Sequence, residues 1–162
     1  MKKVLPSFTL QMATKAAEMR SQGIDIINFS VGEPDFNTPK HIIEAAKKAM
    51  DDGFTKYTAG PGMIEFREAI CEKLHRENDL EYSPSEVLVS NGEKHSLYNA
   101  CQALINPGDE AVVFSPYWVS FPEFVKLSDG VPIIVKTKSE YNFEPDFKDL
   151  ENKSSPKIKC II

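Results

Sequence analysis

The sequence places a lysine and a tight turn together at one point where an anion could bind. Residues 86–94 read E-V-L-V-S-N-G-E-K, a short apolar run that we interpret as a strand, then Asn91-Gly92, then the start of a predicted helix. The amides and the dipole at a helix start attract anions, and Lys94 adds a full positive charge. The residues alone fit a simple tight turn better, because the full spacing of a phosphate loop is missing. His95 by itself fits a surface helix residue.

The only tryptophan of the chain lies in a second segment of interest. Residues 115–123 read S-P-Y-W-V-S-F-P-E and follow an apolar run, residues 110–114, that predicts a strand. In open α/β sheets, ligands bind beyond the carboxyl ends of the strands. The indole of Trp118 could stack on a planar cofactor there, or it could equally cover the top of the core.

Two further loops carry groups that could contact a ligand. The segment V-G-E-P-D-F-N-T-P, residues 31–39, contains Gly32, whose backbone amide a ligand could approach closely. The segment F-T-K-Y-T-A-G-P-G, residues 54–62, contains Tyr57, a hydrogen-bond donor, and two glycines that resemble a phosphate loop only weakly. Taken alone, the first loop fits a solvated turn shaped by its Asp and Asn residues.

The elements that must position these loops follow an alternating pattern. Apolar periodicity and punctuation by Gly and Pro predict helices and short strands in turn. The helices are predicted over residues 8–22, 39–53 (capped by Thr38), 63–78, 93–105, 122–127 and 146–153, and the strands over 86–90, 110–114, 131–136 and 157–162. This alternation predicts an α/β domain with a largely parallel sheet.

Composition excludes several classes of function. The chain has 162 residues and a formal charge of −5, which argues against nucleic-acid binding. Its start, M-K-K-V-L-P, has no long apolar run, so we expect no signal peptide, no membrane span and a cytoplasmic location. The three cysteines lack metal-type spacing. Cys71 and His75 could share a metal, but no second ligand pair accompanies them, so we predict no metal site.

Taken in order, the motifs point to one family. They are V-G-E-P-D-F-N-T-P, K-Y-T-A-G-P-G followed by R-E-A-I, V-S-N-G-E-K-H-S-L-Y-N-A, N-P-G-D-E and S-P-Y-W-V-S-F-P-E. This series closely resembles the class I pyridoxal-phosphate-dependent aminotransferases, and most closely their prokaryotic-type aspartate aminotransferase branch. The resemblance runs from about Pro6 to the last residue.

The resemblance implies a role for each matched residue. Gly32 matches the glycine whose amide binds the substrate carboxylate, and Trp118 the aromatic residue that stacks on the cofactor ring. Tyr57 matches the tyrosine that reaches the cofactor phosphate of the neighbouring subunit, so a homodimer is implied. One cofactor should span these segments, which predicts Trp118 and Lys94 at the same sheet edge with Gly32 nearby.

The resemblance also implies a phosphate site at the helix start. Gly92, Glu93 and Lys94 match the triplet that holds the phosphate of pyridoxal phosphate. The middle position is usually small in the family, and here it is Glu93. A carboxylate beside a phosphate dianion is repulsive, so we expect phosphate binding to be weakened but not abolished.

The implied fold is the N-terminal part of the fold-type-I transferase fold. That fold has a three-layer α/β/α large domain, here with an incomplete sheet, plus an N-terminal segment of the small domain. We expect residues 1–45 to form the N-terminal arm and small-domain segment. Residues 46–162 are expected to form the first part of the large cofactor-binding domain.

The implied activity is amino transfer between an amino acid, such as aspartate, and a 2-oxo acid. Family chains are much longer, and K-I-K-C-I-I at the end reads as a strand interior. The Schiff-base lysine, the aspartate that protonates the ring nitrogen and the substrate-clamping arginine match nothing in this sequence. We therefore expect no catalytic residue here and an N-terminal portion that is inactive alone. The alternative is a catalytically dead short chain that binds a phosphate ligand or dimerises.

Overall fold

The structure, a computed structural model, describes residues 7–30 and 32–162. The segment M-K-K-V-L-P, used above to argue against a signal peptide, lies outside the described residues. The chain divides into two compact units: Gly32–Gly92 is one, and the residues before it together with Glu93–Ile162 are the other. The expected domain boundary at residue 45 stays a prediction from the resemblance.

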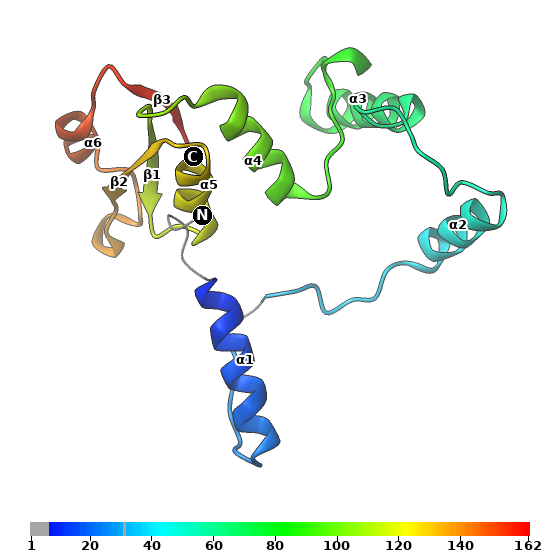
Figure 1. The fold of residues 1–162 in the computed structure, drawn as a ribbon, viewed down its shortest axis with the longest axis horizontal. Helices are drawn as coiled ribbons and strands as arrows, with labels where there is room; N and C mark the ends of the chain where they lie inside the picture. Colours follow the sequence, from blue (N-terminus) through cyan, green and yellow to red (C-terminus); the bar gives the residue numbers. More distant parts are fainter. Residues whose placement is uncertain (1–6, 31) are drawn as a thin grey trace. The chain divides into compact units, whose positions relative to one another are not determined.

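A parallel sheet of three strands organises the larger unit (Figure 1). The strands are β1 (Glu110–Ser115), β2 (Val131–Lys136) and β3 (Ile158–Ile161), in the spatial order β2-β1-β3. Both pairings of β1 are parallel, and Val112 lies beside Ile133 on one side and Ile161 on the other. The predicted α/β architecture with a parallel sheet is confirmed.

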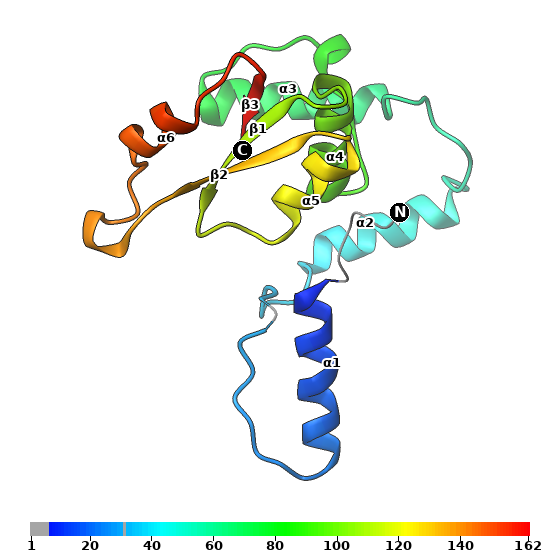
Figure 2. The same cartoon turned by 60° about the vertical axis from the view of Figure 1, so that its left-hand side comes forward.

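The core lies between the sheet and the helices α4 (Glu93–Leu104) and α5 (Ser120–Leu127). Cys101 of α4, Val125 of α5 and Ala111 of β1 form one buried cluster with Ile105, and Cys160 of β3 packs against it. Figure 2 shows the two helices beside the three strands. β1 supplies three fully buried residues in a row, Ala111, Val112 and Val113. A strand buried on both faces reads as a continuous apolar run, which is why A-V-V was recognisable.

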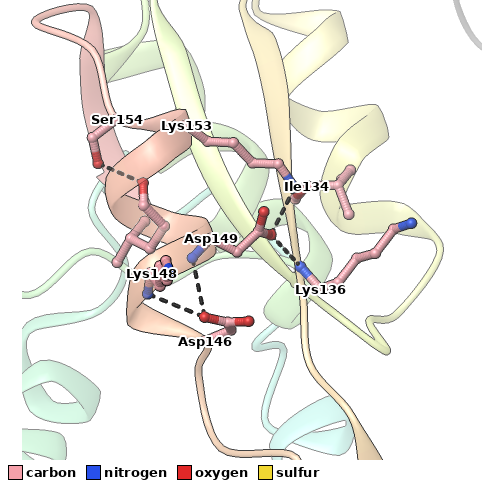
Figure 3. A network of polar contacts seen from close by, with 8 residues as sticks. Ile134, Lys136, Asp146, Lys148, Asp149, Lys153 and Ser154 are labelled. Atoms are coloured by element: carbon pink, nitrogen blue, oxygen red, sulfur yellow. Dashed lines mark hydrogen bonds and ion pairs between the residues drawn. The ribbon is translucent and has the colours of Figure 1, made fainter.

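The outer edge of β2 is covered by the short helix α6 (Phe147–Lys153). Lys153 donates from Nζ to the Ile134 carbonyl at 2.8 Å and pairs with Asp149 at 2.7 Å. The Asp149 carboxylate also accepts from the Lys136 amide at 3.1 Å (Figure 3). These contacts satisfy backbone groups that an edge strand would otherwise present to another chain. Asp146 begins the helix by accepting from the amides of Lys148 and Asp149.

The smaller unit contains two helices and a long connection. Its elements are α2 (Lys40–Asp51), α3 (Ile64–Asn78) and the 3₁₀ turn η1 (Pro84–Glu86). Arg67 of α3 donates from Nη1 to the Pro84 carbonyl at 2.8 Å. The loop after Tyr57 is anchored where the Val89 amide donates to the Pro61 carbonyl at 2.9 Å. The remaining elements, α1 (Phe8–Ser21) and the 3₁₀ turn η2 (Ser139–Tyr141), belong to the larger unit.

Two local predictions are wrong. The segment 86–90 was expected to be a strand, but the structure assigns none there. A strand needs a neighbouring segment that pairs with it through several successive backbone hydrogen bonds. The hydrogen bond from the Val89 amide to the Pro61 carbonyl is a single contact. Thr38 was expected to cap α2, but Pro39 occupies the N-cap and makes no side-chain capping bond. Pro39 has a non-helical ψ of 141°, and its carbonyl accepts from the amides of Ile42 and Ile43.

Candidate functional site

The N-terminus of α4 forms the first part of the site. Gly92 has a φ of +81°, the left-handed region that glycine adopts without a steric penalty, and α4 begins at the next residue. A Cβ built on Gly92 would meet nothing within 4 Å, so the conformation and not crowding calls for glycine there. The positive end of the helix dipole therefore lies at Gly92, Glu93 and Lys94.

The indole of Trp118 forms the second part of the site, beside the same helix start. Trp118 follows the carboxyl end of β1 and precedes α5. The Lys94 ammonium lies over its ring, 4.9 Å from the ring centroid, which is cation–π distance. The prediction that Lys94 and Trp118 lie at the same edge is confirmed. Their roles toward a cofactor stay predictions.

Two phenylalanines surround the indole. The rings of Phe121 and Trp118 have centroids 5.6 Å apart and an interplanar angle of 87°. Phe124 makes a second edge-on contact, at 6.1 Å and 68°. Trp118 remains 37% exposed, so the indole contacts both phenylalanine rings and is still open to solvent. The sequence interpretation missed both phenylalanines, although their spacing of three in W-V-S-F-P-E-F was the signal.

Gly32 and Tyr57 belong to the smaller unit, and Lys94 and Trp118 to the larger one. A Cβ on Gly32 would meet nothing within 4 Å, and the Tyr57 side chain is fully exposed in its loop. The structure thus brings Lys94 and Trp118 together and leaves the roles of Gly32 and Tyr57 as predictions from the resemblance.

Two thiols lie in the core of the larger unit, Cys101 on α4 and Cys160 on β3. Burial raises the pKa of the Cys101 thiol, and the nearby Cys160 raises it further. Burial likewise raises the pKa of Cys160. A raised pKa disfavours the thiolate, which is the nucleophilic form of cysteine. Burial therefore disfavours the thiolate form of both cysteines.

The described residues contain neither a cluster suited to a metal ion nor a helix suited to a membrane span. Across residues 7–30 and 32–162, no group of three or more His, Cys, Asp or Glu residues is arranged to hold a metal ion. Over the same ranges, no helix combines the length and the hydropathy needed to cross a bilayer.

Comparison with known proteins identifies the family to which this chain belongs. A family model described as aminotransferase class I and II matches residues 24–162. The chain belongs to the class I and II aminotransferase family, which confirms the resemblance seen in the motifs.

Individual relatives show which branch of the family this chain is similar to. The chain is 47% identical over 161 residues to an aspartate aminotransferase of Bacillus sp. strain YM-2, covering 99% of this chain and 41% of the relative. It is 45% identical over 157 residues to the aspartate/prephenate aminotransferase of Thermus thermophilus, covering 97% of this chain and 41% of the relative. The chain thus spans about two fifths of the length of these curated relatives.

Solved structures agree with this assignment. The aspartate aminotransferase of Thermus thermophilus, solved with maleate, superposes with a TM-score of 0.93 at 44% identity, over 99% of this chain and 42% of that one. An alanine aminotransferase of Pyrococcus furiosus superposes with a TM-score of 0.87 at 31% identity, over 94% of this chain and 40% of that one.

Proposed function

We propose that this chain provides the phosphate-binding and ring-stacking part of a pyridoxal-phosphate-dependent aminotransferase. The observation that carries the proposal is the position of Lys94 over Trp118 at the start of α4. A helix start with a lysine favours a phosphate, and a half-open indole beside it favours a flat ring. The two groups together fit a planar, phosphorylated cofactor.

Each residue at this site has one task in the proposal. Gly92, with its left-handed backbone, allows the chain to turn directly into α4, so that the helix N-terminus faces the phosphate. Lys94 neutralises phosphate charge, and Trp118 fixes the plane of the ring. The cofactor itself, when bound, supplies the electron sink for amino transfer. Glu93 lies in the first turn and opposes the phosphate charge.

The proposed substrates are an acidic amino acid and a 2-oxo acid. Relatives named aspartate and aspartate/prephenate aminotransferases support a dicarboxylic substrate. The Thermus thermophilus structure contains maleate, a four-carbon dicarboxylate. In this proposal Gly32 binds the α-carboxylate through its backbone amide, and an alanine-type substrate is the competing possibility.

The proposal includes a homodimer, and it requires catalytic side chains that this sequence does not supply. Tyr57 is fully exposed, as a residue that reaches into a neighbouring subunit would be. The lysine, aspartate and arginine that complete the family's chemistry match no position in this sequence. We therefore propose that these 162 residues alone transfer no amino group.

Complementation tests this function. The chain is mixed with a second polypeptide, the part of the Bacillus sp. strain YM-2 aspartate aminotransferase beyond the matched two fifths. Amino transfer from aspartate to a 2-oxo acid is then measured with pyridoxal phosphate present. We expect activity in the mixture only, with loss of activity on Trp118→Ala. Activity of the chain alone, or an associated but inactive mixture, would contradict the proposal.

A further inference from the structure

The Trp118 indole receives edge-on contacts from two rings of the helix that follows it. Phe121 lies at 5.6 Å with an interplanar angle of 87°, and Phe124 at 6.1 Å with 68°. Edge-to-face contacts at these distances are favourable, and each constrains the orientation of the ring that it meets. The Lys94 ammonium marks the indole face that is presented to the start of α4.

These contacts link the indole to the core of the larger unit. The Phe121 amide donates to the Trp118 carbonyl at 3.0 Å, which closes a turn between the loop that holds Trp118 and the start of α5. This turn holds Phe121, in the first turn of α5, against the indole. Phe124 also packs against the buried cluster that includes Cys101 and Val125. The carbonyl of Phe124 accepts from the Ser128 hydroxyl at 3.0 Å.

We propose that Phe121 and Phe124 are positioning residues that fix the orientation of the Trp118 indole and present one of its faces to the anion site on α4. This inference rests on the proposed function for its ligand and deepens it by naming the residues that prepare the stacking surface. A side chain held before binding loses less conformational entropy when the ligand arrives. The ring contacts of both phenylalanines are made with Trp118, so we expect their effect to fall on the cofactor ring more than on the phosphate.

The first test measures the indole without any ligand. Trp118 is the sole tryptophan, so near-ultraviolet circular dichroism and acrylamide quenching of fluorescence report on it directly. The variants are Phe121→Leu and Phe124→Leu, with Phe147→Leu on α6 as a matched control and Phe121→Tyr as a ring-retaining rescue. We expect a reduced dichroism band and faster quenching in the two test variants only. An unchanged Trp118 signal in both test variants would overturn the proposal.

The second test separates positioning from a general loss of structure. Binding of pyridoxine phosphate, which has the ring and phosphate but no reactive aldehyde, is compared with binding of inorganic phosphate. We expect pyridoxine phosphate to bind about threefold to tenfold more weakly in each Leu variant. Inorganic phosphate should change by less than about twofold, because a helix N-terminus and a lysine bind it. Equal weakening of both ligands would overturn the proposal.

The same experiments distinguish the failure of this inference from the failure of the proposed function. Wild-type chain that binds no pyridoxine phosphate would count against the cofactor site. The dichroism and quenching of Trp118 would still decide whether Phe121 and Phe124 fix the indole.

Discussion

The Lys94 ammonium lies 4.9 Å from the centroid of the Trp118 ring, although the two residues belong to different elements, α4 and the loop after β1. A cation held over an indole is stabilised by the negative face of the ring. The same arrangement places a full positive charge beside a flat aromatic surface. This combination of a positive charge and a flat ring is the structural basis for the proposed binding of a phosphorylated cofactor.

Replacing Glu93 by glutamine should tighten phosphate binding. Glu93 lies in the first turn of α4, where its negative charge opposes that of a phosphate. We expect affinity for pyridoxine phosphate to rise by about twofold to fivefold at low salt, and the gain to shrink as ionic strength rises. Glu65→Gln, in the first turn of α3, is the matched control. Unchanged or weaker binding in Glu93→Gln would show that Glu93 does not oppose the phosphate.

Replacing Gly130 by alanine should destabilise the larger unit. A Cβ at this position would lie 2.6 Å from Ile105 Cγ2 and 3.0 Å from Val125 Cγ1. Overpacking of this kind costs about 1–3 kcal/mol of unfolding free energy. Urea unfolding followed by Trp118 fluorescence measures it, with Gly60→Ala as control, since a Cβ there meets nothing within 4 Å. Equal stability of the two variants would contradict the packing described here.

The Asp149 carboxylate should contribute a pH-dependent part of stability. Its pKa is lowered, first by the Lys153 ammonium and then by the Lys136 amide. A carboxyl whose pKa is lowered on folding stabilises the native state above its unfolded pKa, near 3.9, and this contribution is lost as the pH falls through the folded value. We therefore expect the urea midpoint of the wild type to decrease more steeply than that of Asp149→Asn as the pH is lowered below about 4.

The control for this pH series is Asp51→Asn, a change on the exposed surface of α2. It should keep the wild-type acid dependence. Parallel curves for wild type and Asp149→Asn would show that the contacts of α6 with the β2 edge do not stabilise the fold.

No lysine of this chain should act as the attachment point of the cofactor. In our proposal none of its lysines takes the family's Schiff-base position, so treatment with pyridoxal phosphate and borohydride should give scattered, substoichiometric labelling. Peptide mapping by mass spectrometry checks this. One lysine labelled stoichiometrically, together with measurable amino transfer, would contradict the expectation of an inactive chain.

Local patterns predicted the strands and helices of the larger unit well. The runs A-V-V and V-P-I-I-V are apolar and bounded by turn residues, and both form strands. The segment 86–90 has the same appearance but forms no strand, because pairing depends on a neighbour that the local sequence does not contain. The site was predicted in part, because the expected start of a helix pointed to Lys94 and the expected end of a strand pointed to Trp118. The spacing of three could have indicated Phe121 and Phe124, but their contacts also depend on side-chain directions around the indole, which the spacing alone does not set.

The most direct test of the central claim is a titration of Trp118 fluorescence with pyridoxine phosphate. Stacking on the sole tryptophan should quench its emission saturably. Lys94→Met should weaken the apparent affinity by about tenfold, because a charge-assisted contact to phosphate is lost. Lys48→Met, which removes an exposed ion pair with Asp52 on α2, is the matched control and should bind as the wild type does. Quenching that never saturates, or that is the same in Lys94→Met and wild type, would contradict the account.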